Sequence, residues 1–220
     1  MMILVSISAD LKRVLPDLAL GCVSAHVKVE GHSESLWHDI DRHLGHLKAT
    51  HQPDQINSIP TIAAMRRAYK NLGKDPSRYR GSAEALLRRV LSGKGLYQIN
   101  TVVDINNLVS LESFLPMGSY DTANLEPIEL RIGNVGEIYK GIGKDEINIE
   151  NLPVFADARG AFGSPTSDSE RAMIRLQTEQ LLMVVFSFAG ADGLPPWISR
   201  ASELLRKYAG ADRVEEAIVT

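Results

Sequence analysis

Apolar residues recur at helical spacing between positions 102 and 115, and they predict one helix with a single apolar stripe. The stripe is formed by Val102, Ile105, Leu108, Val109 and Leu115. Thr101 is placed to cap the start of this helix, and Asp104 follows three residues later, as in a short-armed capping box. Pro116 cannot continue a helix, so residues 117–121 should leave it as an extended segment.

The first sixth of the chain has the pattern of two short strands followed by a long helix. Residues 3–8 are apolar and β-branched, and residues 18–29 have alternating character, so each segment predicts a strand. A helix should then begin at Ser33 or Ser35 and run to about Ala49. One face of this helix is apolar and comprises Leu36, Trp37, Ile40, Leu44 and Leu47.

The opposite face of that helix carries Asp39, His43 and His46. Carboxylate and imidazole side chains that lie one or two helical turns apart can converge on a metal ion. A solvated polar face produces the same pattern without any ligand. We therefore expect no metal at this position.

Two further helices are predicted between residues 58 and 93. Pro60 suits a first helical turn, and Gly73 ends an apolar stripe of Ile62, Met65, Tyr69 and Leu72. Ser82 is placed to cap the second helix, which Gly93 should end. The inward face of the second helix comprises Leu86, Leu87, Val90 and Leu91.

Beyond Asp121 the pattern changes to short strands punctuated by glycine and proline. Strands are predicted at 127–132, 137–139 and 152–157, with two more runs inside 172–188. A closing helix should then cover 197–208. These elements predict an α+β fold with a β-sandwich-like core, flanking helices and an added N-terminal layer of helix and strand.

Composition fits a globular protein that forms a single compact unit. The chain has 220 residues, of which 44% are hydrophobic and 23% charged, so it can bury a core. Its lone cysteine, Cys22, excludes an intramolecular disulfide and suits a reducing compartment. The apolar run at residues 3–7 is too short for a signal peptide or a membrane span, so we expect a cytoplasmic protein.

Positive charge gathers in one segment, residues 66–94, and makes it a candidate RNA-binding region. Only Asp75 and Glu84 oppose its basic residues, so the segment carries +7 in a chain whose net charge is −3. Such polarity fits contact with a phosphate backbone, although exposed helices also carry lysine and arginine for solubility alone. The basic residues are Arg66, Arg67, Lys70, Lys74, Arg78, Arg80, Arg88, Arg89 and Lys94.

The densest group of polar and glycine residues lies at 159–171. Its two glycines allow backbone N–H groups to approach a ligand, and Arg171 suits a carboxylate or phosphate. A turn-rich connection whose side chains bond to the local backbone is the alternative. The candidate ligand-binding residues are Arg159, Gly160, Ala161, Phe162, Gly163, Ser164, Thr166 and Arg171, with Asp168 as a candidate catalytic group.

Two separated motifs resemble the tRNA-binding and editing domain of the β subunit of bacterial phenylalanyl-tRNA synthetase. The family pattern V-D-V-T-N-Y-V-x-L-E-L-G-Q-P-x-H-A-F-D aligns without a gap to residues 103–121. Its identical positions are Val103, Asp104, Asn107, Val109, Leu111, Glu112, Pro116 and Asp121. Ala156-Asp157 and the run from Gly160 to Ser164 resemble a second family motif downstream. The resemblance covers about residues 60–190.

The resemblance implies a freestanding protein that binds aminoacylated tRNA and hydrolyses a wrongly attached amino acid in trans. It implies an editing-like domain at 60–220, with residues 1–59 as an extension packed on that core. Asn107, Gly118 and the 160–163 backbone would line the aminoacyl pocket. Asp104 and Asp168 would orient the attacking water, and neither a cofactor nor a metal is expected.

The sequence departs from the family at two positions of the expected pocket. The family's histidine in the P-x-H-A-F-D run is Gly118 here, and a glutamate that reads a tyrosine hydroxyl aligns with Val184. A less polar pocket favours an amino acid other than tyrosine, or binding without hydrolysis. The alternative function is therefore a non-catalytic module that binds RNA or a small ligand resembling an amino acid.

Overall fold

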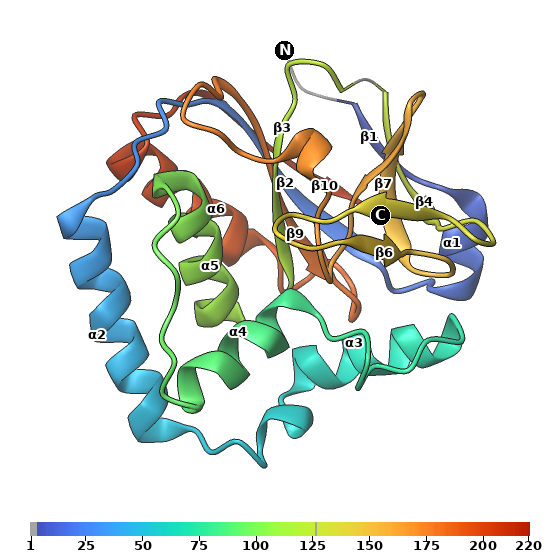
Figure 1. The fold of residues 1–220 in the computed structure, drawn as a ribbon, viewed down its shortest axis with the longest axis horizontal. Coiled ribbons are helices and arrows are strands. Elements are labelled where there is room, and N and C mark those ends of the chain that lie inside the picture. The colour runs from blue at the N-terminus through green and yellow to red at the C-terminus, as the bar shows by residue number, and fades with distance from the viewer. Residues whose placement is uncertain (1–3, 126) are drawn as a thin grey trace.

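Two four-stranded sheets pack face to face, and helices cover the other face of one of them (Figure 1). The computed structural model describes residues 4–125 and 127–220. The helices are α1 (Ala9–Val14), α2 (Glu34–Thr50), α3 (Pro60–Asn71), α4 (Ser82–Leu91), α5 (Thr101–Ser113) and α6 (Pro195–Tyr208). The strands are β1 (Val5–Ile7), β2 (Ala19–His26), β3 (Met117–Asp121), β4 (Ile128–Ile132), β5 (Ile138–Lys140), β6 (Glu146–Asn148), β7 (Pro153–Asp157), β8 (Gly160–Gly163), β9 (Gln180–Ser187) and β10 (Asp212–Val219).

The sheet that the helices cover has the strand order β10-β2-β9-β3, and we call it the central sheet. The outer sheet has the order β1-β4-β7-β8, and β5 pairs with β6 in a separate hairpin. Pairing is antiparallel except between β1 and β4. At one end of this sandwich β1 contacts β10, and at the other end the two edge strands are β8 and β3. The α+β class predicted from the sequence is confirmed.

The central sheet is covered on both faces, which explains why β2 and β9 read as nearly continuous apolar runs. Alternate side chains face the outer sheet, namely Leu20, Cys22, Leu182, Val184 and Phe186. The side chains between them face the helices, namely Ala19, Val23, Ala25, Leu181, Met183 and Val185. Two hydrophobic clusters therefore lie on either side of one sheet.

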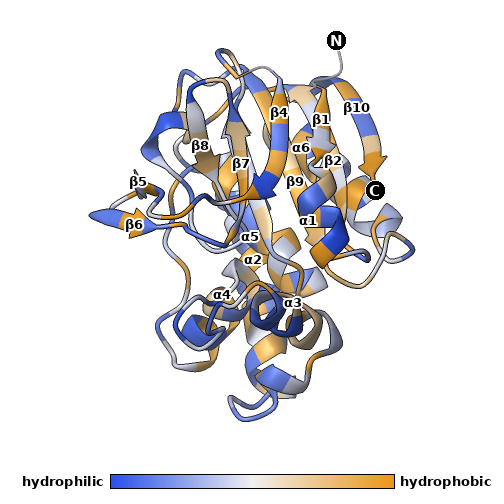
Figure 2. Ribbon diagram, turned by 90° about the vertical axis from the view of Figure 1, so that its right-hand side faces the viewer, coloured by the Kyte–Doolittle hydropathy of each residue, from blue (hydrophilic) through white to orange (hydrophobic). Residues whose placement is uncertain are grey.

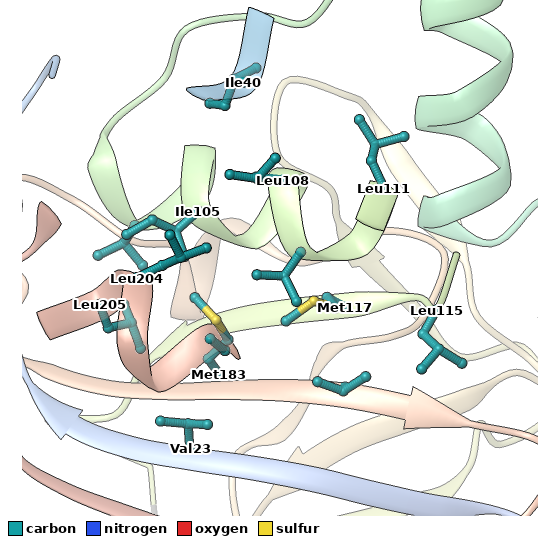
Figure 3. Packing of buried hydrophobic residues seen from close by; sticks show 14 of the residues in the cluster. Val23, Ile40, Ile105, Leu108, Leu111, Leu115, Met117, Met183, Leu204 and Leu205 are labelled. Atoms are coloured by element: carbon teal, nitrogen blue, oxygen red, sulfur yellow. The ribbon is translucent and has the colours of Figure 1, made fainter. Parts of the chain in front are cut away.

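Helix α5 is the centre of the helix layer. Figure 3 shows its Ile105 and Leu108 above Met117 of β3 and Met183 of β9, with Leu204 of α6 beside them. All of these side chains are buried. Since burying one such side chain contributes about 1.5–3 kcal/mol, this contact fixes α5 on the central sheet.

The start of α5 is capped by Asn100, and the prediction of Thr101 as its cap was wrong. Asn100 Oδ1 accepts from the Val103 amide at 3.0 Å. The Thr101 hydroxyl instead accepts from the Glu30 amide at 3.1 Å, which ties α5 to the connection between β2 and α2. Asn is as good a cap as Thr, so the sequence pattern alone did not separate these two positions.

The cap of helix α4 also lies one residue before the predicted position. Its cap is Gly81, and Ser82 is the first helical residue rather than the predicted cap. The Ser82 hydroxyl accepts from the amide of Met117 at 3.2 Å, so it joins α4 to the start of β3. Gly81 is buried against Met65, and an added Cβ there would overlap the Met65 sulfur. A larger residue at position 81 would therefore have to displace the end of the Met65 side chain.

Residues 160–163, predicted as part of a ligand-binding loop, form the edge strand β8. Phe162 is fully buried between the sheets, and its burial holds this short glycine-flanked segment in the outer sheet. The prediction of two strands within 172–188 was also wrong, because only β9 lies there. The Arg175 amide donates to Thr178 Oγ1 at 2.9 Å, and this local turn replaces the first expected strand.

The chain closes with strand β10, which the sequence pattern did not predict. β10 is an edge strand, so its side chains are only partly covered and include Glu215 and Glu216. Such a mixed pattern lacks the clear alternation of a half-buried strand. The short helix α1 between β1 and β2 was missed as well, since one buried residue, Leu11, is too little for a periodic pattern.

The boundary between residues 1–59 and the rest of the chain does not coincide with a boundary between the two sheets. β2 lies within residues 1–59, yet it pairs with β9 and β10 in the middle of the central sheet. Figure 2 shows α3 and α4 below the ends of the strands, where the chain continues from this first segment. None of the helices in the described part of the chain is both long and apolar enough to cross a bilayer.

Candidate functional site

The candidate site lies at the end of the sandwich where β3 and β8 are the edge strands, and Tyr120 is at its centre. Tyr120 is fully buried, and its ring packs edge-on against Phe155 and Phe162 of the outer sheet. An added Cβ at Gly118 would overlap the Tyr120 hydroxyl, and one at Gly163 would overlap its ring. The absence of side chains at these two positions therefore makes room for the phenol.

The Tyr120 hydroxyl donates to Asp168 Oδ1 at 3.0 Å, and the Ser164 amide donates to the same oxygen at 3.1 Å. Burial raises the pKa of the half-buried Asp168 carboxyl to about 7, although these two donors act in the opposite direction. Burial and the nearby Asp168 raise the pKa of Tyr120 well above its usual value, so the phenol stays a donor. The site therefore holds a carboxyl group that changes its charge near neutral pH.

The loop that carries Asp168 is ordered by its own side chains. Ser164 Oγ donates to the Ser167 carbonyl at 2.7 Å and accepts from the Ser167 amide at 3.1 Å. The Tyr139 hydroxyl also donates to the Ser167 carbonyl. Thr166 Oγ1 lies 2.8 Å from the hydroxyl of Tyr69 on α3. The loop is thus fixed between the β5–β6 hairpin and α3.

Asp104, the other candidate catalytic residue, lies in a different part of the molecule. It is 1% exposed on α5, where Oδ2 accepts from Trp37 Nε1 at 2.7 Å and Oδ1 from the Ile99 amide at 3.1 Å. Burial raises the pKa of Asp104, and these two hydrogen bonds lower it in part. Its geometry joins α5 to α2 and to the segment before α5.

Asn107 is half-buried on α5, on the face of the central sheet opposite the outer sheet. The neighbouring amide, Asn106, is the one that bonds to β3, where its Oδ1 accepts from Ser119 Oγ at 2.9 Å. Ser119 faces the helix layer, whereas Gly118 and Tyr120 face the outer sheet. The central sheet therefore lies between α5 and the strand that carries Gly160 and Gly163.

Both candidate arginines of the 159–171 segment contact Asp157, whose side chain is 3% exposed. Arg171 forms two bonds to it, of 2.8 and 2.9 Å, and donates to the Gly160 carbonyl at 2.6 Å. Arg159 is exposed, lies 3.7 Å from the same carboxylate and donates to the Asn124 carbonyl. Burial acts to raise the pKa of Asp157, but the arginines and an amide donor hold it below its usual value.

The remaining predicted binding residues of this segment belong to the strand itself. Gly160 has φ of +117°, a backbone conformation that favours glycine, at the turn between β7 and β8. Ala161 is half-buried in β8, and Phe162 lies in the core. Of the predicted ligand-binding set, the structure brings together Gly118, Gly163, Ser164 and Thr166 around Tyr120 and Asp168.

Three of the nine basic candidates surround one buried carboxylate, Glu84, which is 2% exposed. Arg66 Nη1 lies 2.9 Å from Glu84 Oε2, and Arg88 Nε lies 2.8 Å from Oε1. Arg80 is more distant, at 3.9 Å. Arg88 also donates to Asn57 Oδ1 at 2.7 Å. These arginines neutralise a charge inside the α3–α4 pair and so contribute less to the surface potential than the sequence suggested.

We call the other basic candidates the outward set; four of them are exposed, whereas Lys74 and Arg89 are half-buried. Within residues 4–125 and 127–220, no carboxylate lies within ion-pair distance of them. Lys74 lies over the ring of Tyr79 at 4.5 Å, and Arg89 lies over the ring of Tyr97 at 3.8 Å. This outward set comprises Arg67, Lys70, Lys74, Arg78, Arg89 and Lys94, all in or beside α3 and α4.

On the polar face of α2, Asp39 is bonded to other side chains of the same chain. Asp39 contacts Arg42 at 2.8 Å and Lys207 at 3.3 Å, and it accepts a hydrogen bond from the Tyr208 hydroxyl. The rings of His43 and His46 lie 6.5 Å apart. In the part of the chain that the structure describes, no group of three or more His, Cys, Asp or Glu side chains is arranged to hold a metal ion.

Sequence reasoning missed the tyrosines of the site. Tyr69, Tyr120 and Tyr139 converge on the 164–168 loop from α3, β3 and β5. The sequence pattern placed Tyr69 in an apolar stripe and gave no role in the site to Tyr120 or Tyr139. The one sequence feature that points to this site is the pair of glycines, Gly118 and Gly163. The sequence does not show that both lie against Tyr120.

Comparisons with known proteins place this architecture in a family. The B3/4 domain model matches residues 64–210, so the chain belongs to the B3/4 domain family. A crystal structure of an N-terminal fragment of the phenylalanyl-tRNA synthetase β-subunit from Pyrococcus horikoshii is similar over 100% of this chain, with a TM-score of 0.51 and 11% identity. At this identity the likeness concerns the fold, and the chain spans 51% of that fragment. No curated protein matches the chain.

The resemblance to the synthetase domain inferred from the sequence is thus confirmed. The two departures from the family pattern lie side by side in the structure. Gly118 of β3 and Val184 of β9 are register partners. Val184 is buried on the face that packs against the outer sheet, next to Tyr120. The two positions at which the sequence departs from the family pattern therefore form one patch without polar side chains, with the Tyr120 phenol beside it.

Proposed function

We propose that this protein binds aminoacylated tRNA and hydrolyses the ester that joins a wrong amino acid to it. The observation that carries the proposal is the half-buried Asp168 carboxyl in the loop after the edge strand β8, where Tyr120 and Ser164 bond to one of its oxygens and burial raises its pKa to about 7. A general base is most effective when its pKa lies near the working pH. The proposed location is the cytoplasm, where tRNA is charged.

In the proposed reaction Asp168 takes a proton from a water molecule as the water oxygen attacks the ester carbonyl carbon. The carbon–oxygen bond to the ribose then breaks, and the released ribose oxygen takes the proton that Asp168 removed from the water. The Tyr120 and Ser164 donors hold the carboxylate in one orientation, because both bond to the same oxygen, Oδ1. Oδ2 is left to face the water.

The amino acid is proposed to differ from tyrosine. Gly118 and Val184 offer no hydrogen bond to a substrate hydroxyl, and the Tyr120 phenol already occupies the space beside them. A site that lacks a partner for a hydroxyl leaves that group unpaired when it is buried, which disfavours tyrosine. Smaller side chains fit this proposal better.

The outward cations of α3 and α4 are proposed to contact the tRNA backbone. Arg67, Lys70, Lys74 and Arg78 lie on one helix and the connection that follows it, and charge complementarity favours phosphate there. Arg66, Arg80 and Arg88 are excluded from this proposed contact set because Glu84 holds them.

A panel of mischarged tRNAs, assayed at stoichiometric and at catalytic amounts of protein, tests the function. We expect at least one aminoacyl ester to be hydrolysed with turnover, and Asp168→Asn to abolish that hydrolysis. Asn keeps an acceptor for Tyr120 and Ser164, so the variant should stay folded. Asp145→Asn, a change at an exposed position, serves as the matched control.

A second function is favoured by one observation, the filling of the space between Gly118 and Gly163 by Tyr120. A domain with no room for an aminoacyl side chain would bind tRNA without turnover. Retained tRNA binding with no hydrolysis of any ester in the panel would support this binding module and remove the hydrolase proposal.

A further inference from the structure

The connection between α4 and α5, residues 92–100, presents an aromatic ring to solvent. Tyr97 is 64% exposed, and the Arg89 guanidinium carbon lies 3.8 Å from the centre of its ring. A guanidinium stacked on an aromatic ring keeps its N–H donors in its own plane, where they can still reach an anion. One face of Tyr97 is thus supported by Arg89, and the ring remains largely accessible.

The donors of this pair are largely unused. Among the described residues, Arg89 Nε is buried and has no hydrogen-bond partner, and Arg89 Nη2 reaches only the Lys94 carbonyl, at 3.5 Å, so a ligand would be bound by the terminal nitrogens of the guanidinium. Lys94 is exposed, and neither it nor Arg89 has a carboxylate within ion-pair distance in residues 4–125 and 127–220. One unpaired cation, Arg89, therefore lies on the Tyr97 ring, and a second, Lys94, belongs to the same connection between α4 and α5.

Other tyrosines of the chain do not offer the same surface. Tyr79 has Lys74 and Arg78 near its ring, at 4.5 and 5.8 Å, but it is half-buried against the core between the sheets. Tyr69 and Tyr120 are fully buried. An exposed ring and an unpaired cation lying on it coincide at Tyr97.

We propose that Tyr97, Arg89 and Lys94 bind an unpaired nucleotide of single-stranded RNA. The base stacks on the open face of Tyr97, and its phosphate lies against Arg89 and Lys94. Bases in a duplex are already stacked on each other, so a duplex does not use this surface. Figure 1 shows this connection beside α2, on the helix side of the molecule and away from the β5–β6 hairpin.

This inference rests on the proposed function in taking RNA as the partner, and it adds the part of the RNA that is recognised. Because the Tyr97 surface lies outside the hydrolytic site, a segment of tRNA other than the aminoacylated residue would occupy it. Binding at this surface needs no ester chemistry, so the two proposals can fail separately.

Fluorescence anisotropy with a labelled single-stranded oligoadenylate tests the inference, with a hairpin duplex RNA of equal length for comparison. We expect Tyr97→Ala to weaken single-strand binding about tenfold, because stacking on one aromatic side chain contributes a factor of this order. Tyr97→Phe keeps the ring and should bind like the unaltered protein. Leu176→Ala removes a comparably exposed apolar side chain elsewhere and is the matched control.

Three outcomes would overturn the inference: no single-strand binding by the unaltered protein, equal losses in Tyr97→Ala and Leu176→Ala, or equal losses for single-strand and duplex RNA. Oligoadenylate binding that depends on Tyr97, together with no ester hydrolysis, would leave this surface standing and remove the hydrolase. If the unaltered protein hydrolyses an ester while Tyr97→Ala binds oligoadenylate normally, the hydrolase would stand and the Tyr97 surface would be removed.

Discussion

The hydroxyl of Tyr120 donates to Asp168 Oδ1 across 3.0 Å, and this bond joins the edge of the central sheet to the loop that follows β8. The bond is possible because Gly118 and Gly163 leave space for the phenol. It also fixes the carboxyl group on which the proposed hydrolysis depends. The protonation of Asp168 is therefore coupled to the packing of the two sheets.

The first prediction is that Asp168 makes folding more favourable at low pH. Burial raises its pKa in the folded protein from 3.8 to about 7, so the folded state keeps the proton while the unfolded chain loses it. The stability from this group is fully present below about pH 4 and is lost as the pH rises towards 7. Asp168→Asn removes the titrating group, so its stability relative to the unaltered protein should improve across that range.

Urea unfolding of both proteins at several pH values between about 4.5 and about 7.5 measures this difference. We expect a change on the order of 2 kcal/mol across the range, since one pKa unit corresponds to about 1.4 kcal/mol and the group is only half-buried. Carboxylates with lowered pKa values, such as Asp157, are present in both proteins, and their effects cancel. Parallel stability curves would contradict the prediction.

The second prediction concerns the contact between Gly118 and Tyr120. Gly118→Ala places a methyl group on the Tyr120 hydroxyl and should cost about 1–3 kcal/mol of stability. Tyr120→Phe alone should cost about 1 kcal/mol through the lost hydrogen bond. The double variant should lose less than the sum of the two, because removing the hydroxyl relieves part of the overlap.

Gly45→Ala is the control for that series. Gly45 lies in α2 with nothing within 4 Å of an added Cβ, so alanine there should stabilise the protein by about 0.5–1 kcal/mol. Chemical denaturation gives all of these values. Strict additivity of Gly118→Ala and Tyr120→Phe would show that the two side chains do not compete for the same space.

The third prediction separates two adjacent arginines. Arg66 contacts the buried Glu84, so Arg66→Ala should lower stability by about 2–4 kcal/mol by leaving a carboxylate with fewer partners. Arg67 is exposed, so Arg67→Ala should leave stability within about 0.5 kcal/mol. Thermal unfolding compares the two directly.

The same pair should behave in the opposite way towards RNA. If Arg67 contacts a phosphate, its loss should make tRNA affinity less dependent on salt, with a slope smaller by about one. Binding titrations over a range of salt concentrations give this slope. An Arg67→Ala protein with an unaltered slope would remove Arg67 from the proposed backbone contacts.

The helices were largely predictable from sequence, and the site was not. Residues such as Leu36, Ile40 and Leu44 repeat with the period of a helix whatever they pack against, so their pattern is a local property. The edge strand β10 carries Glu215 at a partly covered position and Glu216 at an exposed one, and a local pattern does not reveal this strand. Whether such a segment forms a strand depends on how elements distant in the sequence bury it.

Charge in the sequence does not show which side chains are free to bind a ligand. The sequence predicted Arg171 as a ligand-binding residue, and in the structure it forms an ion pair with Asp157 of strand β7. The sequence predicted Arg66 as an RNA contact, and in the structure it forms an ion pair with Glu84. Ion pairs depend on which segments the fold brings together. The position of Tyr120 between Gly118 and Gly163 depends in the same way on two strands from different sheets.

The last prediction distinguishes the two aspartates proposed from sequence as catalytic groups. Both oxygens of Asp104 accept hydrogen bonds, one from Trp37 Nε1 and one from the Ile99 amide. Asn offers only one acceptor, so Asp104→Asn sets its amide N–H against one of these donors and should cost about 1–3 kcal/mol of stability. Asp104 lies in the contact of α5 with α2, so the folded variant should keep its rate of ester hydrolysis. Asp168→Asn should do the opposite, with stability retained at neutral pH and hydrolysis lost. Unfolding curves and single-turnover deacylation of both variants give the comparison, and an Asp104→Asn protein that is fully stable but inactive would return Asp104 to the reaction.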